Sequence, residues 1–398
     1  MTSDASAPRT SLLAAAALVA ASFVVTFLLG EIAIRLVHPS ASLWRFPNYI
    51  EQVTRPDPDQ PAELLRHDSV LGWEPQPGAS GILMHQPVSY SDNGLRNQNK
   101  TLALSDGRPI LAVGDSYTLG YAVKDDETWP ANLERRLQER VLNGGVHGYA
   151  LDQIVLRADK LADSLHPPTI ILAFIADDID RTGLSVKDST YKSYFVVKGD
   201  GLELRNVPVP PTRSDGPHTW PRRILGYSYL LEFVMHRIGG RELWYGAQVS
   251  TGEDAPTISC RLMARFAGSV RRHSAHALVV ALPQYNDWED AKASAADHKR
   301  TSMVLECAHR QGLQTLDTYG GFAALSKDPR LLYVDWHLNA AGNGIAARLI
   351  AAALPDTLGS PLEAIAPSGG FPSRRPCSRR SSGTRCDRRP RRCLRSRD

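Results

Sequence analysis

Hydrophobic residues form two patterns along the chain, and the first of them is continuous. Residues 10–30 are 21 consecutive residues without a charge. A helix rises about 1.5 Å per residue, so this run spans about 30 Å, the hydrocarbon thickness of a bilayer. Apolar residues continue at helical spacing through residues 31–37, whereas the apolar core of a signal peptide is about 7–15 residues long. We therefore predict a transmembrane anchor at residues 11–37 after a short cytoplasmic leader at residues 1–10, with a cleaved signal peptide as the alternative.

The second pattern alternates short apolar runs with segments of helical periodicity. Trp129, Leu133 and Leu137 recur every four residues, which predicts an amphipathic helix over residues 127–141. Further helices are expected over residues 150–165, 295–311 and 340–354, and strands over residues 109–113, 141–146, 169–175, 277–282 and 313–317. This alternation predicts an α/β fold in which a parallel sheet has helices on both faces.

The remaining segments follow neither pattern. Residues 38–105 are rich in Pro, Gly, Asn and Asp around short extended runs, so we predict a small β-rich extension without chemistry of its own. An insertion at about residues 183–270 interrupts the alternation, with a hairpin expected over residues 194–205 and an apolar helix over residues 224–238. We expect this insertion to lie near the carboxyl edge of the sheet, where ligands bind in α/β folds.

Charge is distributed unevenly along the chain. The formal net charge is +4, but residues 367–398 hold eleven Arg and two Asp, which gives this tail +9 and leaves −5 for the rest. Because the tail has almost no aliphatic residues, we predict that residues 357–398 are disordered and are either non-native sequence or a basic arm. The mildly acidic remainder gives no reason to expect a nucleic-acid partner.

Composition limits the class of protein. Hydrophobic residues make up 42% of the chain, as in ordinary globular proteins, which excludes a wholly disordered chain. Five cysteines in 398 residues exclude a disulfide-dense scaffold. Three of the five lie in the tail, and the other two, Cys260 and Cys307, could pair if this part of the chain is exported.

Polar residues with catalytic potential lie in four blocks close to the predicted strands. Ser116 follows the first strand in a Gly-Asp-Ser turn, where a hydroxyl and a backbone N–H are exposed. Residues 143–149 contain three Gly, which let a backbone N–H approach a substrate oxygen. Asp177 follows the third strand, and Asp335 and His337 precede the last helix. An acid and a histidine two residues apart could supply a base and the carboxylate that orients it.

These four blocks, in this order, resemble the SGNH/GDSL hydrolases over about residues 106–356, and the extension and anchor resemble the membrane-anchored members of that group. The resemblance implies a three-layer α/β/α flavodoxin-like fold and no metal or organic cofactor. It implies that Ser116 is the nucleophile, His337 the general base and Asp335 its carboxylate partner. The backbone N–H groups of Ser116 and Gly148 match two oxyanion-hole donors.

The third oxyanion donor departs from the family pattern. An Asn is expected there, and this chain has Asp177. An ionised carboxylate cannot donate a hydrogen bond and repels a developing oxyanion, so Asp177 could serve only when protonated. The leading hypothesis is a membrane-anchored serine esterase acting outside the cytoplasm on an acyl-ester small molecule or an acylated glycan. The alternatives are an O-acyltransferase for cell-surface polysaccharide and a weakly active binding protein.

Overall fold

A computed structural model describes residues 10–37, 62–98, 109–211, 220–240, 244–246 and 248–359. The leader, the first part of the predicted extension and the Arg-rich end of the chain lie outside these residues. Helix α1 (Thr10–Val37) covers the predicted anchor. Within α1, Leu13–Val37 is long and apolar enough to cross a membrane, which agrees with the sequence pattern.

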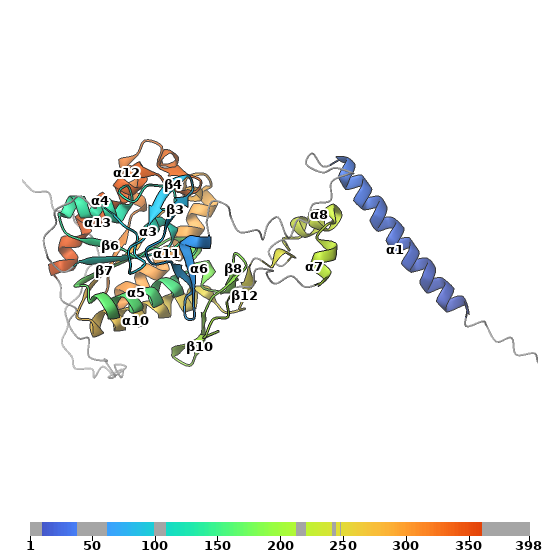
Figure 1. Ribbon diagram of the computed structural model, residues 1–398, viewed down its shortest axis with the longest axis horizontal. Helices are drawn as coiled ribbons and strands as arrows, with labels where there is room; N and C mark the ends of the chain where they lie inside the picture. Colours follow the sequence, from blue (N-terminus) through green and yellow to red (C-terminus); the bar gives the residue numbers. More distant parts are fainter. Residues whose placement is uncertain are drawn as a thin grey trace, which may run out of the picture. The chain divides into compact units, whose positions relative to one another are not determined.

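A five-stranded parallel sheet forms the centre of the fold (Figure 1). Its strands are β5 (Ile110–Val113), β6 (Val141–Asn143), β7 (Thr169–Phe174), β13 (His276–Ala281) and β14 (Gln314–Asp317). The spatial order is β14-β13-β7-β5-β6, and every neighbouring pair is parallel. Counted along the chain, this is the 2-1-3-4-5 order of flavodoxin-like folds. The predicted parallel α/β sheet is therefore confirmed.

Alternate residues of each strand enter two separate cores, one on each face of the sheet. On one face, the strands pack against α5 (Leu151–Leu165), α10 (Ala255–Arg272) and α11 (Ala291–Arg310). On the other, they pack against α4 (Trp129–Leu137), α12 (Tyr319–Leu325) and α13 (Ala340–Gly359). Figure 1 shows α5 and α10 on the opposite side of the sheet from α4 and α13. The result is the predicted three-layer α/β/α arrangement.

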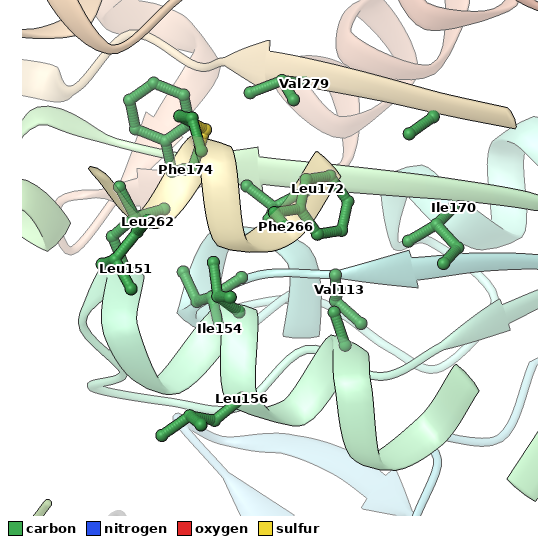
Figure 2. Packing of buried hydrophobic residues seen from close by; sticks show 14 of the residues in the cluster. Val113, Leu151, Ile154, Leu156, Ile170, Leu172, Phe174, Leu262, Phe266 and Val279 are labelled. Atoms are coloured by element: carbon green, nitrogen blue, oxygen red, sulfur yellow. The ribbon is translucent and has the colours of Figure 1, made fainter. Parts of the chain in front are cut away.

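Figure 2 shows the first of these cores at the level of side chains. Leu172 and Phe174 of β7 point toward Ile154 of α5 and Leu262 and Phe266 of α10, and all five are fully buried. Burying one such side chain stabilises the folded state by about 1.5–3 kcal/mol. Six consecutive buried residues make up β7, which explains why the sequence pattern identified this strand.

The segment before the sheet consists of a short 3-10 helix and two antiparallel hairpins. Its elements are η1 (Ala62–Leu64), β1 (Leu65–Asp68), β2 (Gly72–Pro75), β3 (Ser80–Leu83) and β4 (Gln86–Ser89). Hydrogen bonds tie this extension to the main domain: Trp73 Nε1 donates to the His147 carbonyl at 3.0 Å, and the buried Arg96 donates to the carbonyls of Leu119 and Val123. The extension thus supports the loops that follow β5 and β6.

The insertion begins after α6 (Ala176–Arg181) and is shorter than predicted. It contains β8 (Leu184–Lys187), β9 (Thr190–Tyr191), β10 (Tyr194–Lys198), β11 (Gly201–Arg205), α7 (Trp220–Leu225), α8 (Tyr229–Arg237) and β12 (Val249–Ser250). The predicted hairpin is β10–β11, but the single helix expected over 224–238 is two helices. The last part of the predicted insertion is α10, which belongs to the core.

Candidate active site

Ser116 is the first residue of the short helix α3 (Ser116–Leu119), directly after β5. Asp115 caps this helix: its carboxylate accepts a hydrogen bond from the Tyr117 N–H at 2.9 Å. A Cβ at Gly114 would lie 2.0 Å from Thr118 Oγ1 and 2.7 Å from the Ala173 carbonyl oxygen, so only glycine fits there. The Gly-Asp-Ser turn therefore holds Ser116 at the carboxyl end of the sheet, with an N–H group that has no intrahelical partner.

His337 reaches Ser116 from the other end of the sequence. It begins β16 (His337–Leu338), which pairs with β15 (Tyr333–Val334) in a small hairpin. The distance between His337 Nε2 and Ser116 Oγ is 3.0 Å. His337 Nδ1 lies 2.8 Å from the main-chain carbonyl oxygen of Asp335. A carbonyl only accepts, so this contact assigns the imidazole proton to Nδ1 and leaves Nε2 free to accept the Ser116 proton.

The sequence predicts that the Asp335 carboxylate holds the His337 imidazole, but in the structure the main-chain carbonyl of Asp335 makes this contact. Asp335 is exposed, and its main-chain oxygen makes the hydrogen bond to His337. The reason lies in the turn: Asp335 and Trp336 form the two-residue loop between β15 and β16, with φ angles of 43° and 66°. Such loops require positive φ at both positions. In this conformation the Asp335 carbonyl points at the ring, and its carboxylate faces solvent.

Burial lowers the pKa of the His337 imidazole, and the hydrogen bond to the Asp335 carbonyl partly offsets this effect. The ring of Tyr121 lies against it with a centroid separation of 4.7 Å, and Tyr121 also stacks on His147 at 4.2 Å. The Tyr117 hydroxyl donates to the Trp336 carbonyl at 2.6 Å, which ties the histidine hairpin to α3. A neutral, oriented imidazole is the form that a general base requires.

Gly148 lies in the loop after β6, beside the histidine. The rings of His147 and His337 are 6.3 Å apart. Asn143 fixes this loop by donating to the Thr118 carbonyl at 2.9 Å and accepting from the Gly145 N–H at 3.0 Å. Gly148 has a φ of +73°, a conformation that favours glycine. The structure thus holds the Gly148 loop alongside α3, and the oxyanion-donor role of the Gly148 N–H stays a prediction.

Asp177 lies on α6 and is not buried. Its side chain is 49% exposed, and its Oδ2 is 3.5 Å from Arg181 Nη2. Its backbone N–H donates to Gln284 Oε1 at 2.9 Å. A half-exposed carboxylate paired with a guanidinium accepts hydrogen bonds and does not donate them. The structure therefore places the Asp177 side chain half in solvent, beside the Arg181 guanidinium.

Arg181 pairs with three carboxyl groups, and two of them, those of Asp115 and Asp178, are buried. Arg181 Nη1 donates to Asp178 Oδ1 at 2.9 Å and lies 3.9 Å from Asp115 Oδ2. Burial raises the pKa of Asp115 to about 6, against the opposing effect of the Arg181 guanidinium. Burial, together with the nearby Asp115 carboxylate, raises the pKa of Asp178 well above its usual range. Asp115 Oδ2 is also 3.3 Å from Ser116 Oγ, so these charged groups lie next to the Ser116 hydroxyl.

Sequence reasoning missed three neighbours of this site: Arg181, Gln284 and Tyr285. Arg181 stands four residues after Asp177, the spacing of ion pairs on a helix, and this signal could have identified it. Trp336 is 60% exposed, and its ring meets Tyr285 edge-on at a centroid separation of 5.0 Å. These two rings form an aromatic surface next to the β15–β16 hairpin.

Neither the family models nor the curated proteins give a match to this chain. Solved structures do give matches, each covering about two thirds of this chain. LAE5, an alpha/beta hydrolase from the metagenome of Lake Arreo, is 14% identical with a TM-score of 0.40 over 64% of this chain and 98% of its own. A lipolytic protein of the G-D-S-L family from Desulfitobacterium hafniense is 14% identical with a TM-score of 0.33, over 62% and 99%.

A variant of Axe2, an acetyl xylan esterase from Geobacillus stearothermophilus, is 14% identical with a TM-score of 0.39, over 63% of this chain and 96% of its own. The matched structures thus include an acetyl xylan esterase and a lipolytic protein of the G-D-S-L family.

Proposed function

We propose that this chain is a serine esterase of the SGNH/GDSL type, in which Ser116 forms an acyl-enzyme. The observation that carries the proposal is the 3.0 Å contact between Ser116 Oγ and His337 Nε2 at the carboxyl end of the parallel sheet. Nucleophile and base are within hydrogen-bond distance, and a third group, the Asp335 carbonyl, orients the base. This is the arrangement that activates a serine hydroxyl.

The reaction proceeds in two acyl-transfer steps. His337 Nε2 takes the Ser116 proton while Oγ attacks the ester carbonyl carbon, and the resulting oxyanion faces the N–H groups of Ser116 and Gly148. The tetrahedral intermediate then breaks the bond to the alcohol, which leaves with the proton held by His337. Water repeats the sequence on the acyl-enzyme and releases a carboxylic acid and free Ser116.

A second function, transfer of the acyl group to a sugar hydroxyl, is favoured by one observation. The exposed Trp336 and its neighbour Tyr285 present an aromatic surface beside His337, and such surfaces suit the apolar faces of sugar rings. In that reaction a glycan hydroxyl takes the place of water in the second step. Acetyl groups on cell-surface polysaccharide are the substrate class that fits both reactions.

We also propose that α1 anchors the chain in a membrane and that the hydrolase domain lies outside the cytoplasm. The length and apolar character of Leu13–Val37 support the anchor. A disulfide between Cys260 and Cys307 supports the location, because disulfides persist in oxidising compartments and are rare in the cytosol. The two cysteines outside the tail thus pair, as the sequence allowed.

The test uses the full chain in detergent or nanodiscs with p-nitrophenyl acetate as substrate. We expect nitrophenol release that is lost in Ser116→Ala and retained in Ser164→Ala, a matched change on the exposed part of α5. Release that survives in Ser116→Ala would contradict the esterase proposal. Addition of a xylo-oligosaccharide separates the two reactions, since transfer yields an acetylated sugar and hydrolysis yields acetate alone.

A further inference from the structure

Near its carboxyl end, α1 carries an acidic residue, Glu31, and a basic residue, Arg35, and both contact the insertion. The Glu31 carboxylate accepts hydrogen bonds from the backbone N–H groups of Tyr229 and Leu230, at 3.0 and 2.9 Å, and from Ser228 Oγ at 2.8 Å. These groups form the first turn of α8. Glu31 therefore supplies a negative charge to the positive end of that helix.

Arg35 completes this contact from the next turn of α1. It is only 5% exposed, its Nε lies 2.6 Å from Glu31 Oε1, and its Nη2 donates to the Tyr227 carbonyl at 2.8 Å. Its guanidinium lies over the Tyr229 ring, 4.5 Å from the centroid. A Cβ at Gly30 would lie 2.8 Å from Leu230 Cδ2, so the two helices approach closely at a glycine. The start of α8 is thus fixed against α1.

The sequence places this contact at the edge of the bilayer. Residues 10–30 are free of charge and long enough to fill the hydrocarbon layer. Glu31 is the first charged residue after that run, and Arg35 follows one turn later. The first residues of α8 bind Glu31, so α8 starts at the level of the membrane surface, and three residues separate the end of α7 from it along the chain.

Apolar side chains on α7 and α8 are exposed to an unusual degree. Trp220 is 75% exposed and Ile238 is 69% exposed. Seven large apolar or aromatic residues within residues 220–238 are exposed: Trp220, Ile224, Leu225, Tyr227, Phe233, Val234 and Ile238. Scattered exposure of single residues is normal, but a concentration of this kind marks an interaction surface.

We propose that α7 and α8 lie in the interface between bilayer and water, with these seven side chains inserted among the lipids. Continuity with α1 selects lipid as the partner, because the same contact that buries Arg35 holds the apolar surface at the membrane boundary. The composition agrees: aromatic residues prefer the headgroup level, and Arg223 and Arg237 are suited to lipid phosphates. The inference rests on the proposed anchoring of α1.

Fluorescence quenching tests this placement on the full chain in nanodiscs of phosphatidylcholine and phosphatidylglycerol. An environment-sensitive fluorophore is attached to a cysteine at Ile224→Cys or Ile238→Cys. Val24→Cys in α1 and Leu331→Cys, 74% exposed on the hydrolase domain, are the reference positions. The background replaces the three tail cysteines with Ser, and the remaining two are joined in a disulfide.

We expect lipid-borne nitroxide to quench positions 224 and 238 several-fold more than aqueous iodide does, and position 331 to show the reverse. If 224 and 238 behave like 331 while 24 is quenched by lipid, the inference is wrong and the anchor stands. If 24 itself is not quenched by lipid, the anchor and the inference both fail. Protection of 224 and 238 from both quenchers would show a protein partner in place of lipid and would overturn the inference.

Discussion

At the scale of single residues, the histidine is the part of the site whose support differs most from the family pattern. His337 is oriented by a main-chain carbonyl, and the Asp335 carboxylate faces solvent. A main-chain oxygen cannot be removed by substitution of the side chain. Asp335 therefore contributes through its main-chain oxygen and His337 through its imidazole ring. Substitution of the two side chains should consequently have different effects on activity.

We predict that Asp335→Asn lowers kcat/KM less than about tenfold, because Asn keeps the carbonyl and can adopt positive φ. In contrast, His337→Ala removes the base and should cost about 10³-fold or more. Steady-state hydrolysis of p-nitrophenyl acetate measures both. If Asp335→Asn is as damaging as His337→Ala, the carboxylate orients the imidazole during turnover and the main-chain assignment is wrong.

The second residue-scale prediction concerns the oxyanion site. Asp177→Asn replaces a hydrogen-bond acceptor by a donor and removes a negative charge. Loss of one oxyanion donor lowers kcat about 10²–10³-fold in other enzymes. We therefore expect kcat to rise by about tenfold or more in Asp177→Asn. Asp180→Asn is the matched control, because Asp180 also lies on α6, is also half-exposed and is also paired with an Arg. An Asp177→Asn rate equal to or below that of the unaltered chain would contradict this account.

The third concerns pH. Burial disfavours the charged imidazolium, so the pKa of His337 is lowered from its usual 6.5. Only the neutral ring accepts the Ser116 proton; hence kcat/KM should fall as the pH decreases, with its midpoint below 6.5. Asp115, with a pKa of about 6, could produce a similar limb, but that limb would disappear in Asp115→Asn. A midpoint above 6.5 would show that the ring is stabilised in its charged form.

At the scale of elements, the sequence predicted β7 and β13 well because each is a short, mostly apolar run. Residues 169–175 and 277–282 correspond to β7 and β13 within one residue at each end. The assignment of α10 failed, although Ile258, Leu262 and Phe266 recur at i, i+4 and i+8. The sequence did not show where the insertion ends, because Arg and Ser lie between these positions and the preceding segment has no regular periodicity.

The site could be predicted as a set of residues but not as a geometry. Motif order identified Ser116, His337 and the Gly148 loop, which the structure brings together. The motif does not encode the backbone conformation of the turn at Asp335 and Trp336, and this turn decides which oxygen meets the ring. Likewise, Gln284 reaches the site through loop packing, which no local pattern specifies, whereas Arg181 has a local signal in its i,i+4 spacing from Asp177.

The disulfide allows a prediction at this scale, because Cys260 of α10 and Cys307 of α11 are 47 residues apart. Closing a loop of that length stabilises the folded state by about 2–4 kcal/mol, chiefly through the unfolded chain. Replacement of both cysteines by Ala should lower the free energy of unfolding by this amount, measured by denaturant titration. Equal stability of the double variant and the unaltered chain would show that the bond contributes nothing.

At the scale of the whole molecule, the net charge of +4 is not a guide to the substrate. The α/β domain belongs to the part of the chain with a net charge of −5, while the eleven Arg of the tail lie outside the described residues. The extension before the sheet, predicted to lack chemistry, holds the loops of the site through Trp73 and Arg96. An intact site therefore depends on more of the chain than the four motif blocks.

The central claim is that Ser116 becomes acylated, and one measurement tests it most directly. The full chain is mixed with p-nitrophenyl acetate, quenched in acid and digested, and the peptides are analysed by mass spectrometry. We predict an acetyl group on the peptide that contains Ser116, absent in Ser116→Ala and strongly reduced in His337→Ala. Acetylation elsewhere, or nitrophenol release with Ser116 unmodified at every quench time, would contradict the account.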